Sequence, residues 1–274
     1  MAVSVTFWGV RGSISCCSSE YTEYGGNTAC VQIDLDDHTI IIDAGSGLRP
    51  LGDELAKQNK TDISLLISHT HWDHICGFPF FGPLFEKETD INIYAPLQPD
   101  GKSVKDVLAI LMSAPFFPLP LHKLPSGLYF NHFQAPEELS LYDGQVKIQT
   151  VSLIHPNGSA GYRINYQDKS ICYISDYEHS RTGSAEELTD FVKDCDLMIY
   201  DAMYTPEEYL QFKGWGHSNW EQAALLTKKA NIKKTALFHH APVHTDSVMR
   251  MIEQKAQTVE PKVFAAKEKM TITL

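Results

Sequence analysis

The stretch SHTHWDHICG, residues 68–77, places three histidines and one aspartate within six consecutive positions. It begins as the apolar run ISLLI ends, and a short apolar run of this kind is typical of a buried β-strand. Side chains alternate along a strand, so His69 and His71 are expected on one face. A turn after the strand would bring Asp73 and His74 to the same centre. Because imidazole and carboxylate groups are the usual ligands of zinc and related divalent metals, the stretch predicts a metal site.

Side chains of the same kind follow three other apolar runs. His155 comes after TVSLI, Asp176 after SICYIS, and the pair His239-His240 after KTALF. Strand ends that share one edge are where a layered α/β protein assembles its site. Each residue alone is commonly structural, but together with residues 69–74 they supply enough ligands for two metal ions.

Short β-rich runs and amphipathic segments occur along the whole chain. Strands are expected over residues 3–10, 29–35, 39–45, 62–68, 91–96, 146–153, 161–166, 170–176, 196–202 and 234–240. Helices are expected over residues 51–60, 104–112, 185–193, 219–230 and 245–257. Strands dominate the first third and then alternate with helices, which predicts a layered α/β or α+β protein.

A single domain, residues 1–274, is expected, with a Pro- and aromatic-rich insert near 113–133. The insert reads SAPFFPLPLHKLPSGLYFNHF, and its prolines argue against a long regular element. It is interpreted as an ordered loop packed on the body, as a wall or lid over a ligand site, or as the contact of a homodimer.

Composition limits the classes of partner. The 274 residues, 43% of them hydrophobic, are enough to bury a substantial core. The net charge of −11 argues against broad, sequence-independent binding of nucleic acid, which needs Lys and Arg to neutralise phosphates. It leaves room for a small anionic substrate, because bound metal ions would dominate the local field.

The cell compartment is inferred from features that the sequence lacks. No apolar run approaches the roughly 20 residues needed to cross a bilayer, so no membrane partner is expected. The N-terminal MAVSVTFWGVRGS does not resemble a signal peptide. The six cysteines show no disulfide-framework spacing. A cytoplasmic protein with reduced cysteines is therefore expected.

The HxHxDH pattern of residues 69–74, followed in order by His155, Asp176 and His239, resembles the metallo-β-lactamase superfamily. TIIIDAGSG (39–47) is similar to the Asp-x-Gly turn that precedes the histidine motif in that family. The resemblance extends over nearly the whole chain. It implies a four-layer αββα sandwich, with two sheets face to face and helices outside.

The resemblance also implies a centre with two divalent metal ions and seven ligands. The first ion would be held by His69, His71 and His155, the second by Asp73, His74 and His239, with Asp176 between them. His239 matches the family's last ligand better than His240, because it directly follows the strand. Asp43 would orient the histidine loop by hydrogen bonds. Zinc suits the histidine-rich set, and manganese or iron would also be accepted.

Two cations about 3.5–4 Å apart lower the pKa of a shared water toward about 7. The resulting hydroxide would attack carbon or phosphorus, and the metals would stabilise the charge that develops on substrate oxygens. Asp73 would also orient this nucleophile. The presence of both Asp73 and His74 favours a hydrolase over the family's iron-dependent redox branch, whose motif carries a Glu in the second ligand position.

GWGHSNWEQAALL (214–226) resembles a motif of the phosphodiesterase branch, which includes tRNase Z and small cyclic phosphodiesterases. Its histidine contacts phosphate and protonates the leaving oxygen, and His217 is the matching position. The alternative is that His217 caps the following helix. Asp201 either holds the tautomer of His217 or caps a turn. In tRNase Z an acidic residue lies three positions before the bridging Asp; that position is Tyr173 here, so the usual acid–histidine pair is not expected.

FWGVRGS (7–13) and YGGNTAC (24–30) resemble the N-terminal signature of a subgroup related to the phosphonate-pathway cyclic phosphodiesterase. Arg11 is interpreted either as a clamp on a phosphate oxygen or as part of a salt bridge in the body. Asn27 and Thr28 are expected along the same edge of the site.

The resemblance and the charge together predict a phosphodiesterase that acts on a small phosphodiester, such as a cyclic nucleotide or a cyclic phosphate. Phe116, Phe117 and Tyr129 would stack on a base or sugar. A stable nucleic-acid complex is not expected, because the chain has no basic or Gly/Pro-rich arm for gripping tRNA. The alternatives are a lactone, thioester or β-lactam hydrolase of the same fold, or a non-catalytic ligand-sensing module.

Overall fold

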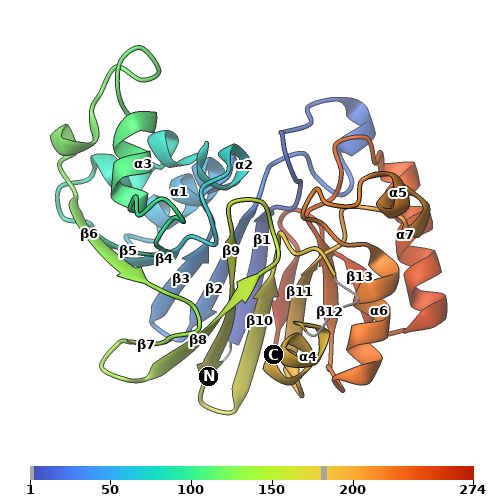
Figure 1. The fold of residues 1–274 in the computed structure, drawn as a ribbon. Coiled ribbons are helices and arrows are strands. Elements are labelled where there is room, and N and C mark those ends of the chain that lie inside the picture. Colours follow the sequence, from blue (N-terminus) through green and yellow to red (C-terminus); the bar gives the residue numbers. More distant parts are fainter. Residues whose placement is uncertain (1–2, 180–183) are drawn as a thin grey trace.

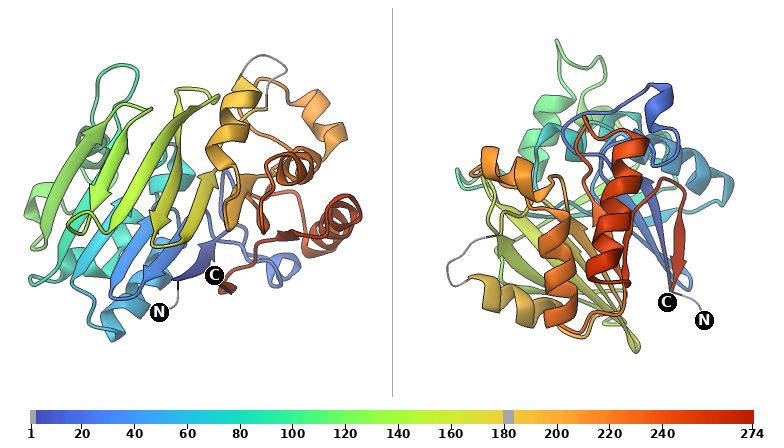
Figure 2. Two further views of the ribbon diagram at one scale, coloured as in Figure 1. Left: turned by 90° about the horizontal axis from the view of Figure 1, so that it is seen from below. Right: turned by 90° about the vertical axis from the view of Figure 1, so that its right-hand side faces the viewer.

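Two seven-stranded sheets lie face to face in the computed structural model, which describes residues 3–179 and 184–274 (Figure 1). Helices cover the outer face of each sheet, as the two further views in Figure 2 show. The predicted four-layer αββα sandwich is therefore confirmed.

The first sheet has the strand order β14-β1-β2-β3-β4-β5-β6. The strands from β3 to β6 are parallel to one another, so their C-terminal ends lie on one edge, whereas β1 is antiparallel to both β14 and β2. The bounds are β1 (Val3–Gly9), β2 (Cys30–Leu35), β3 (His38–Ile42), β4 (Asp62–Leu66), β5 (Asp90–Pro96), β6 (Gly127–Phe133) and β14 (Thr271–Thr273).

The second sheet has the strand order β13-β12-β11-β10-β9-β8-β7. The strands from β10 to β13 are parallel, and those from β7 to β10 are antiparallel. The bounds are β7 (Glu138–Leu141), β8 (Val146–Leu153), β9 (Ser159–Tyr166), β10 (Lys169–Ile174), β11 (Leu197–Asp201), β12 (Thr235–Phe238) and β13 (Val263–Ala265).

The helices are divided between the two outer faces. On the first sheet, α1 (Leu48–Lys57) and α3 (Val104–Leu111) share an apolar cluster with β4 and β5. On the second sheet, α4 (Ser184–Val192), α6 (Trp220–Lys229) and α7 (Asp246–Val259) do the same with β10 to β12. The remaining helical pieces are short: α2 (Trp72–Ile75), α5 (Pro206–Gln211), η1 (Ser19–Tyr21), η2 (Phe78–Phe80), η3 (Gly82–Phe85) and η4 (Leu121–Lys123).

The main core lies between the sheets. Alternate residues of β1, including Val5 and Phe7, point into it and are fully buried. The ring of Phe7 meets that of Phe238 from β12 with centroids 6.2 Å apart. Burying a side chain of this size stabilises the fold by about 1.5–3 kcal/mol, so the period-two pattern read from the sequence fixes which face of β1 points inward.

The insert at 113–133 differs from the expectation. Its first part is irregular and projects beyond α3 (Figure 1), but its last seven residues form β6, a regular edge strand. The strand begins after the last proline of the insert, so no ladder hydrogen bond is lost there. Phe117 packs on the body against Phe80, whereas Phe116 is 74% exposed.

Among the described residues, no helix combines the length and the apolar composition that crossing a bilayer requires.

The two sheets are hydrogen-bonded to each other just before the histidine motif. The buried Tyr162 hydroxyl of β9 donates to the carbonyl of Ile67 over 2.6 Å. The N–H of Ala160, also from β9, donates to the carbonyl of Ser68 over 3.0 Å. These bonds fix the segment between β4 and His69 relative to the second sheet.

We expect Tyr162→Phe to lower the free energy of unfolding by about 1–3 kcal/mol, because it leaves the buried carbonyl of Ile67 without its donor. Denaturant unfolding followed by circular dichroism measures the change. Tyr129→Phe is the matched control, since that hydroxyl is on an exposed strand and makes only a 3.4 Å contact with Asp90. Its effect should stay within about 0.5 kcal/mol. Equal losses of unfolding free energy in the two variants would contradict the role assigned to the hydrogen bond between Tyr162 and Ile67.

Candidate metal centre

Four strand ends bring the predicted ligands together. His69 and His71 follow β4, and Asp73 and His74 lie on the short helix α2 that comes next. The other three ligands follow strands of the second sheet: His155 after β8, Asp176 after β10 and His239 after β12. The structure places all seven in one buried or half-buried cluster.

The first group consists of His69, His71, His155 and Asp176, whose ligand atoms all lie within 4.8 Å of one another. His155 Nε2 is 3.0 Å from His71 Nδ1. Asp176 Oδ1 is 3.7 Å from His69 Nε2 and 3.6 Å from His155 Nε2. Four atoms at these separations can surround one ion at the 2.0–2.2 Å typical of zinc–nitrogen and zinc–oxygen bonds.

His69 supplies an independent sign that a cation belongs here. Its Nδ1 bonds to Ser68 Oγ, but its Nε2 is buried and has no hydrogen-bond partner among the described residues. An unsatisfied buried polar atom costs about 1–3 kcal/mol. Because this atom faces the other three ligand atoms of the first group, an ion bound there would satisfy it.

The second group consists of Asp73, His74 and His239. Asp73 Oδ2 is 3.1 Å from His239 Nε2 and 3.4 Å from His74 Nε2. The other oxygen of Asp176, Oδ2, is 3.1 Å from His74 Nε2 and 3.4 Å from His239 Nε2. The two oxygens of Asp176 therefore face different groups, which is the arrangement of a bridging carboxylate.

The electrostatics of the cluster favour a positive charge. Burial works against the charged form of His74, but the carboxylates of Asp176, Asp73 and Asp43 raise its pKa well above its usual value. Burial likewise opposes ionisation of Asp73, yet His74 and His239 lower its pKa. Ionised carboxylates in a buried site need a compensating cation, and a divalent metal provides one.

Three of the residues around the centre have left-handed backbone conformations. Asp43, Asp176 and His239 have φ of 62°, 57° and 60°, and each comes just after a strand of the parallel part of its sheet. A non-glycine residue with positive φ is uncommon and indicates local strain. Here each of the three side chains is held in the cluster directly after its strand ends.

Asp43 holds the histidine motif from behind. One oxygen, Oδ2, accepts hydrogen bonds from His74 Nδ1 (2.8 Å), Ser68 Oγ (2.8 Å) and Tyr173 Oη (2.7 Å). The other oxygen accepts the N–H of Ser68 over 2.7 Å. With the proton of His74 held at Nδ1, Nε2 is left to bind an ion. Tyr173 thus binds Asp43, a contact that the sequence did not predict.

The structure separates His239 from His240. His240 points away from the cluster: its Nε2 donates to the carbonyl of Ala266 over 2.9 Å, and burial lowers its pKa to about 3. His239 faces Asp73 and the other ligands. Gly12 packs so closely on the His239 ring that a Cβ there would lie 2.4 Å from it, so any larger residue would displace the ring.

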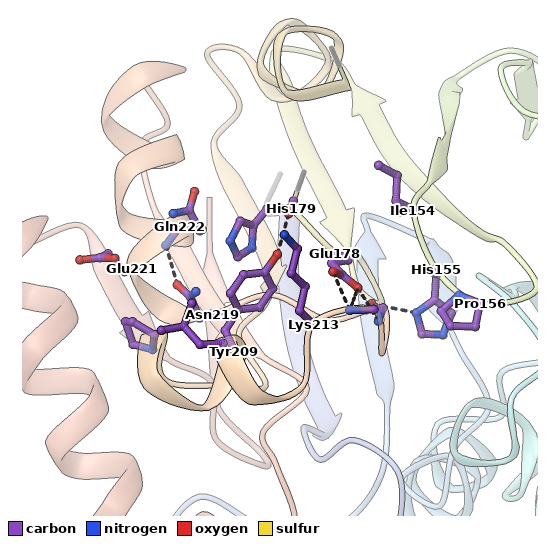
Figure 3. Close-up of a pocket in the computed structure, with 14 residues that line it drawn as sticks. Ile154, His155, Pro156, Glu178, His179, Tyr209, Lys213, Asn219, Glu221 and Gln222 are labelled. Atoms are coloured by element: carbon purple, nitrogen blue, oxygen red, sulfur yellow. Dashed lines mark hydrogen bonds between the residues drawn. The ribbon is translucent and has the colours of Figure 1, made fainter. Parts of the chain in front are cut away.

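His155 is oriented by a glycine turn that a carboxylate holds in place. Its Nδ1 donates to the carbonyl of Gly216 over 2.8 Å, and Gly216 has φ of 88°. The N–H groups of Gly214 and Gly216 donate to the Glu178 carboxylate over 2.8–2.9 Å (Figure 3). The sequence analysis missed Glu178. The sequence signal was the GWG turn, since glycine N–H groups away from a helix or sheet need an acceptor.

His217 is paired with Asp201. Its Nδ1 donates to Asp201 Oδ2 over 2.8 Å, and its ring stacks on His239 with centroids 5.0 Å apart. Burial works against protonation, but Asp201 raises the pKa of His217 to about 9. Asp201 also accepts the N–H of Met203, so it both orients the histidine and stabilises a turn.

The family-style pair, with an acid at the position of Tyr173, is absent as expected. The acid comes instead from Asp201 at the end of β11, beside β10, which is one of the two roles expected for that residue. The alternative role of His217 as a helix cap is not found, because the side chain of Asn219 caps α6 by accepting the N–H of Gln222.

Arg11 does not reach the cluster as a phosphate clamp. Its side chain is fully buried, with Nε donating to Gly25 O (2.7 Å) and Nη1 to His244 O (2.6 Å). Both acceptors are backbone carbonyls, so the guanidinium joins the N-terminal loops to the segment after β12. No face of it is open to a ligand, so it is not placed to clamp a substrate phosphate.

Asn27 also acts within the loops. Its side chain accepts the Ser46 hydroxyl (2.9 Å) and donates to Glu268 (3.1 Å). The N-terminal segment does reach the centre, but through its backbone: the N–H of Ser13 donates to Asp73 Oδ2 over 2.6 Å. This contact fixes a carboxylate of the second group.

With this geometry, the fold and the site together define a metal-dependent hydrolase. Residues 38–240 match the family model described as beta-lactamase superfamily domain. The chain belongs to this superfamily.

Several known proteins are similar to it. Ribonuclease BN of Cronobacter sakazakii is 22% identical over 77% of this chain and 81% of its own length. Ribonuclease Z of Sulfurisphaera tokodaii is 39% identical, but over 31% of this chain and 28% of its own. The crystal structure of the metallo-beta-lactamase fold protein YhfI from Bacillus subtilis has a TM-score of 0.76 at 18% identity over the whole of both chains. A diphosphatase of the PhnP family has a TM-score of 0.70 at 15% identity, covering 98% of this chain and 97% of its own.

We expect the chelator-stripped protein to take up two Zn²⁺ per chain, measured by elemental analysis after dialysis. His71→Ala should retain about one, because His71 belongs to the first group alone. Asp176→Asn should weaken both sites, since its oxygens face both groups. His122→Ala, on the exposed turn η4, is the control and should still take up two. A folded wild-type protein that bound no zinc would contradict the assignment.

Proposed function

We propose that the protein is a phosphodiesterase with two metal ions, acting on a small phosphodiester such as a cyclic nucleotide or a cyclic phosphate. The observation that carries this proposal is the Asp201–His217 pair beside the ligand cluster. The pair places a proton donor beside the cluster, and the alkoxide leaving group of a phosphodiester needs one.

The residues have separate roles in this mechanism. The two ions, held by the seven ligands, would supply a water of lowered pKa and balance the charge on the phosphate. Asp73, fixed by Ser13, positions the nucleophile. Asp201 keeps the proton of His217 on Nδ1 when the ring is neutral, and its carboxylate favours the protonated ring. His217 then donates its second proton, from Nε2, to the leaving oxygen.

RNA is the second candidate substrate, because relatives of this chain are named ribonuclease Z and ribonuclease BN. The net charge of −11 supports a small substrate instead, since a long polyanion would be repelled away from the metal ions. We propose zinc as the metal, because five of the seven ligands are histidines. A cytoplasmic location and a homodimer contact at 113–133 remain predictions.

We expect the zinc-loaded protein to hydrolyse bis-p-nitrophenyl phosphate and at least one member of a panel of cyclic mono- and dinucleotides. Stripping the metals should abolish both activities. Faster hydrolysis of a lactone, thioester or β-lactam than of any phosphodiester would favour the ester hydrolase. Tight binding of a panel member without turnover would favour the ligand-sensing module, and preferential cleavage of RNA would favour the second candidate.

We expect His217→Ala to reduce kcat by about 10²–10⁴-fold on a substrate with an alkoxide leaving group, the usual contribution of a general acid. The loss should be much smaller on bis-p-nitrophenyl phosphate, because p-nitrophenolate leaves without a proton. The ratio of the two losses is the measurement, and it separates proton donation from a general disturbance of the site. Equal losses on both substrates would refute the role.

A further inference from the structure

A cavity of about 1010 Å³ opens beside the ligand cluster (Figure 3). His155 forms part of its wall, and so do Gly216 and Asn219, the residues on either side of the His217–Ser218 dipeptide. A smaller cavity, of about 470 Å³, borders the cluster at His69 and His71 and is also lined by Lys102. The cluster is therefore bordered by two cavities, each with room for a substrate group.

The position of the proton donor, His217, distinguishes the two cavities. A general acid must lie within hydrogen-bond reach of the oxygen that it protonates. His217 itself lies in the cluster, stacked on His239, but Gly216 and Asn219 on either side of the His217–Ser218 dipeptide line the larger cavity, and no residue from 214 to 219 lines the smaller one. The larger cavity is therefore the one next to the proton donor, and the leaving half is assigned to it; the half that stays on phosphorus is assigned to the smaller one.

Two features of the larger cavity suit a nucleoside. The rings of His179 and Tyr209 stack with centroids 4.1 Å apart, and Figure 3 shows both in the lining. Aromatic surfaces of this kind bind bases by stacking. The side-chain amide of Gln222 has no hydrogen-bond partner within residues 3–179 and 184–274, so it is available to a base or sugar.

Lys213 gives the cavity a positively charged group. Lys213 is an exposed residue of the lining, and its ammonium group has no ion pair or hydrogen bond within the described part of the chain. Of the two carboxylates in the lining, Glu178 already accepts the N–H groups of the glycine turn, and Glu221 lies at the end farthest from His155 (Figure 3). Lys213 lies between the His155 end and the Glu221 end of the cavity, where an anionic group on the leaving half would contact its ammonium group.

We infer that the larger cavity binds the leaving half of the substrate, and that this half is a nucleoside carrying a second phosphate, which pairs with Lys213. The inference rests on the proposed function. It narrows the substrate to a dinucleotide, cyclic or linear, because a cyclic mononucleotide has no second phosphate. The cavity is at the upper end of the 300–1,000 Å³ typical of small-molecule sites, large enough for a group of this size.

The test uses linear dithymidine substrates, whose two halves can be phosphorylated separately. Mass spectrometry of the products of the unphosphorylated dinucleotide first shows which half leaves. The value of kcat/KM is then compared for the unphosphorylated dinucleotide and for the forms with a terminal phosphate on the leaving half or on the retained half. We expect a phosphate on the leaving half to raise kcat/KM about tenfold, and one on the retained half to have a much smaller effect.

Lys213→Met should bring this tenfold ratio close to one. The matched control is Lys102→Met, which removes an exposed lysine from the lining of the smaller cavity, where it pairs with Asp100. The control should keep the wild-type ratio. Each ratio is taken within one variant, so a change in overall activity cancels.

A wild-type ratio near one, a ratio that survives in Lys213→Met, or a ratio lost equally in Lys102→Met would overturn the inference. Turnover of bis-p-nitrophenyl phosphate without cleavage of any dinucleotide would also overturn it, but would leave the phosphodiesterase intact. No turnover of any phosphodiester by the zinc-loaded protein would overturn both.

Discussion

The burial of Asp176 is the constraint on which the rest of the site depends. Its carboxylate is almost wholly shielded from water and lies among imidazoles from both sheets. Such a group is stable when charged only if its surroundings compensate the charge. Histidines alone can do so when protonated, but two cations do it without protonation and use the same nitrogens as ligands. The cluster is therefore arranged for ions, and the fold is what holds it together.

That fold makes the convergence possible because both sheets end their parallel strands near the same place. The ends of β3 and β4 approach those of β10 and β12, and the hydrogen bonds from β9 to Ile67 and Ser68 join the two edges. The left-handed conformations of Asp43, Asp176 and His239 turn the chain directly after each strand, so that no longer loop is needed to bring these side chains to the centre. Short connections leave each side chain little freedom, and the hydrogen bonds to Asp43 and to the Gly216 carbonyl orient His74 and His155.

Local patterns were enough to predict a layered α/β protein and the candidate ligands, since HTHWDH, His155, Asp176 and the pair His239-His240 each follow a recognisable strand. The four-layer sandwich and the choice of His239 came from the resemblance to the family. For Asp201 the local patterns left two roles open, and its pairing with His217 could not be decided in this way. It depends on β11 lying next to β10, a parallel pairing that no periodicity records. The expected role of Arg11 as a phosphate clamp could not be tested by local pattern for a related reason. The sequence does not distinguish a buried guanidinium that donates to backbone carbonyls from one that faces a ligand. The short elements α2, α5, β13 and β14 are too brief for any period to be detected.

The glycine turn at 214–216 links metal binding, through His155, to proton delivery, through His217. It accepts the proton of His155 and, through the next residue, presents His217. Any redesign of this wall to admit a new substrate would disturb metal affinity and proton delivery at once. New selectivity is accordingly easier to introduce at Leu210 of α5, an exposed residue that lines the larger cavity and lies outside the glycine turn.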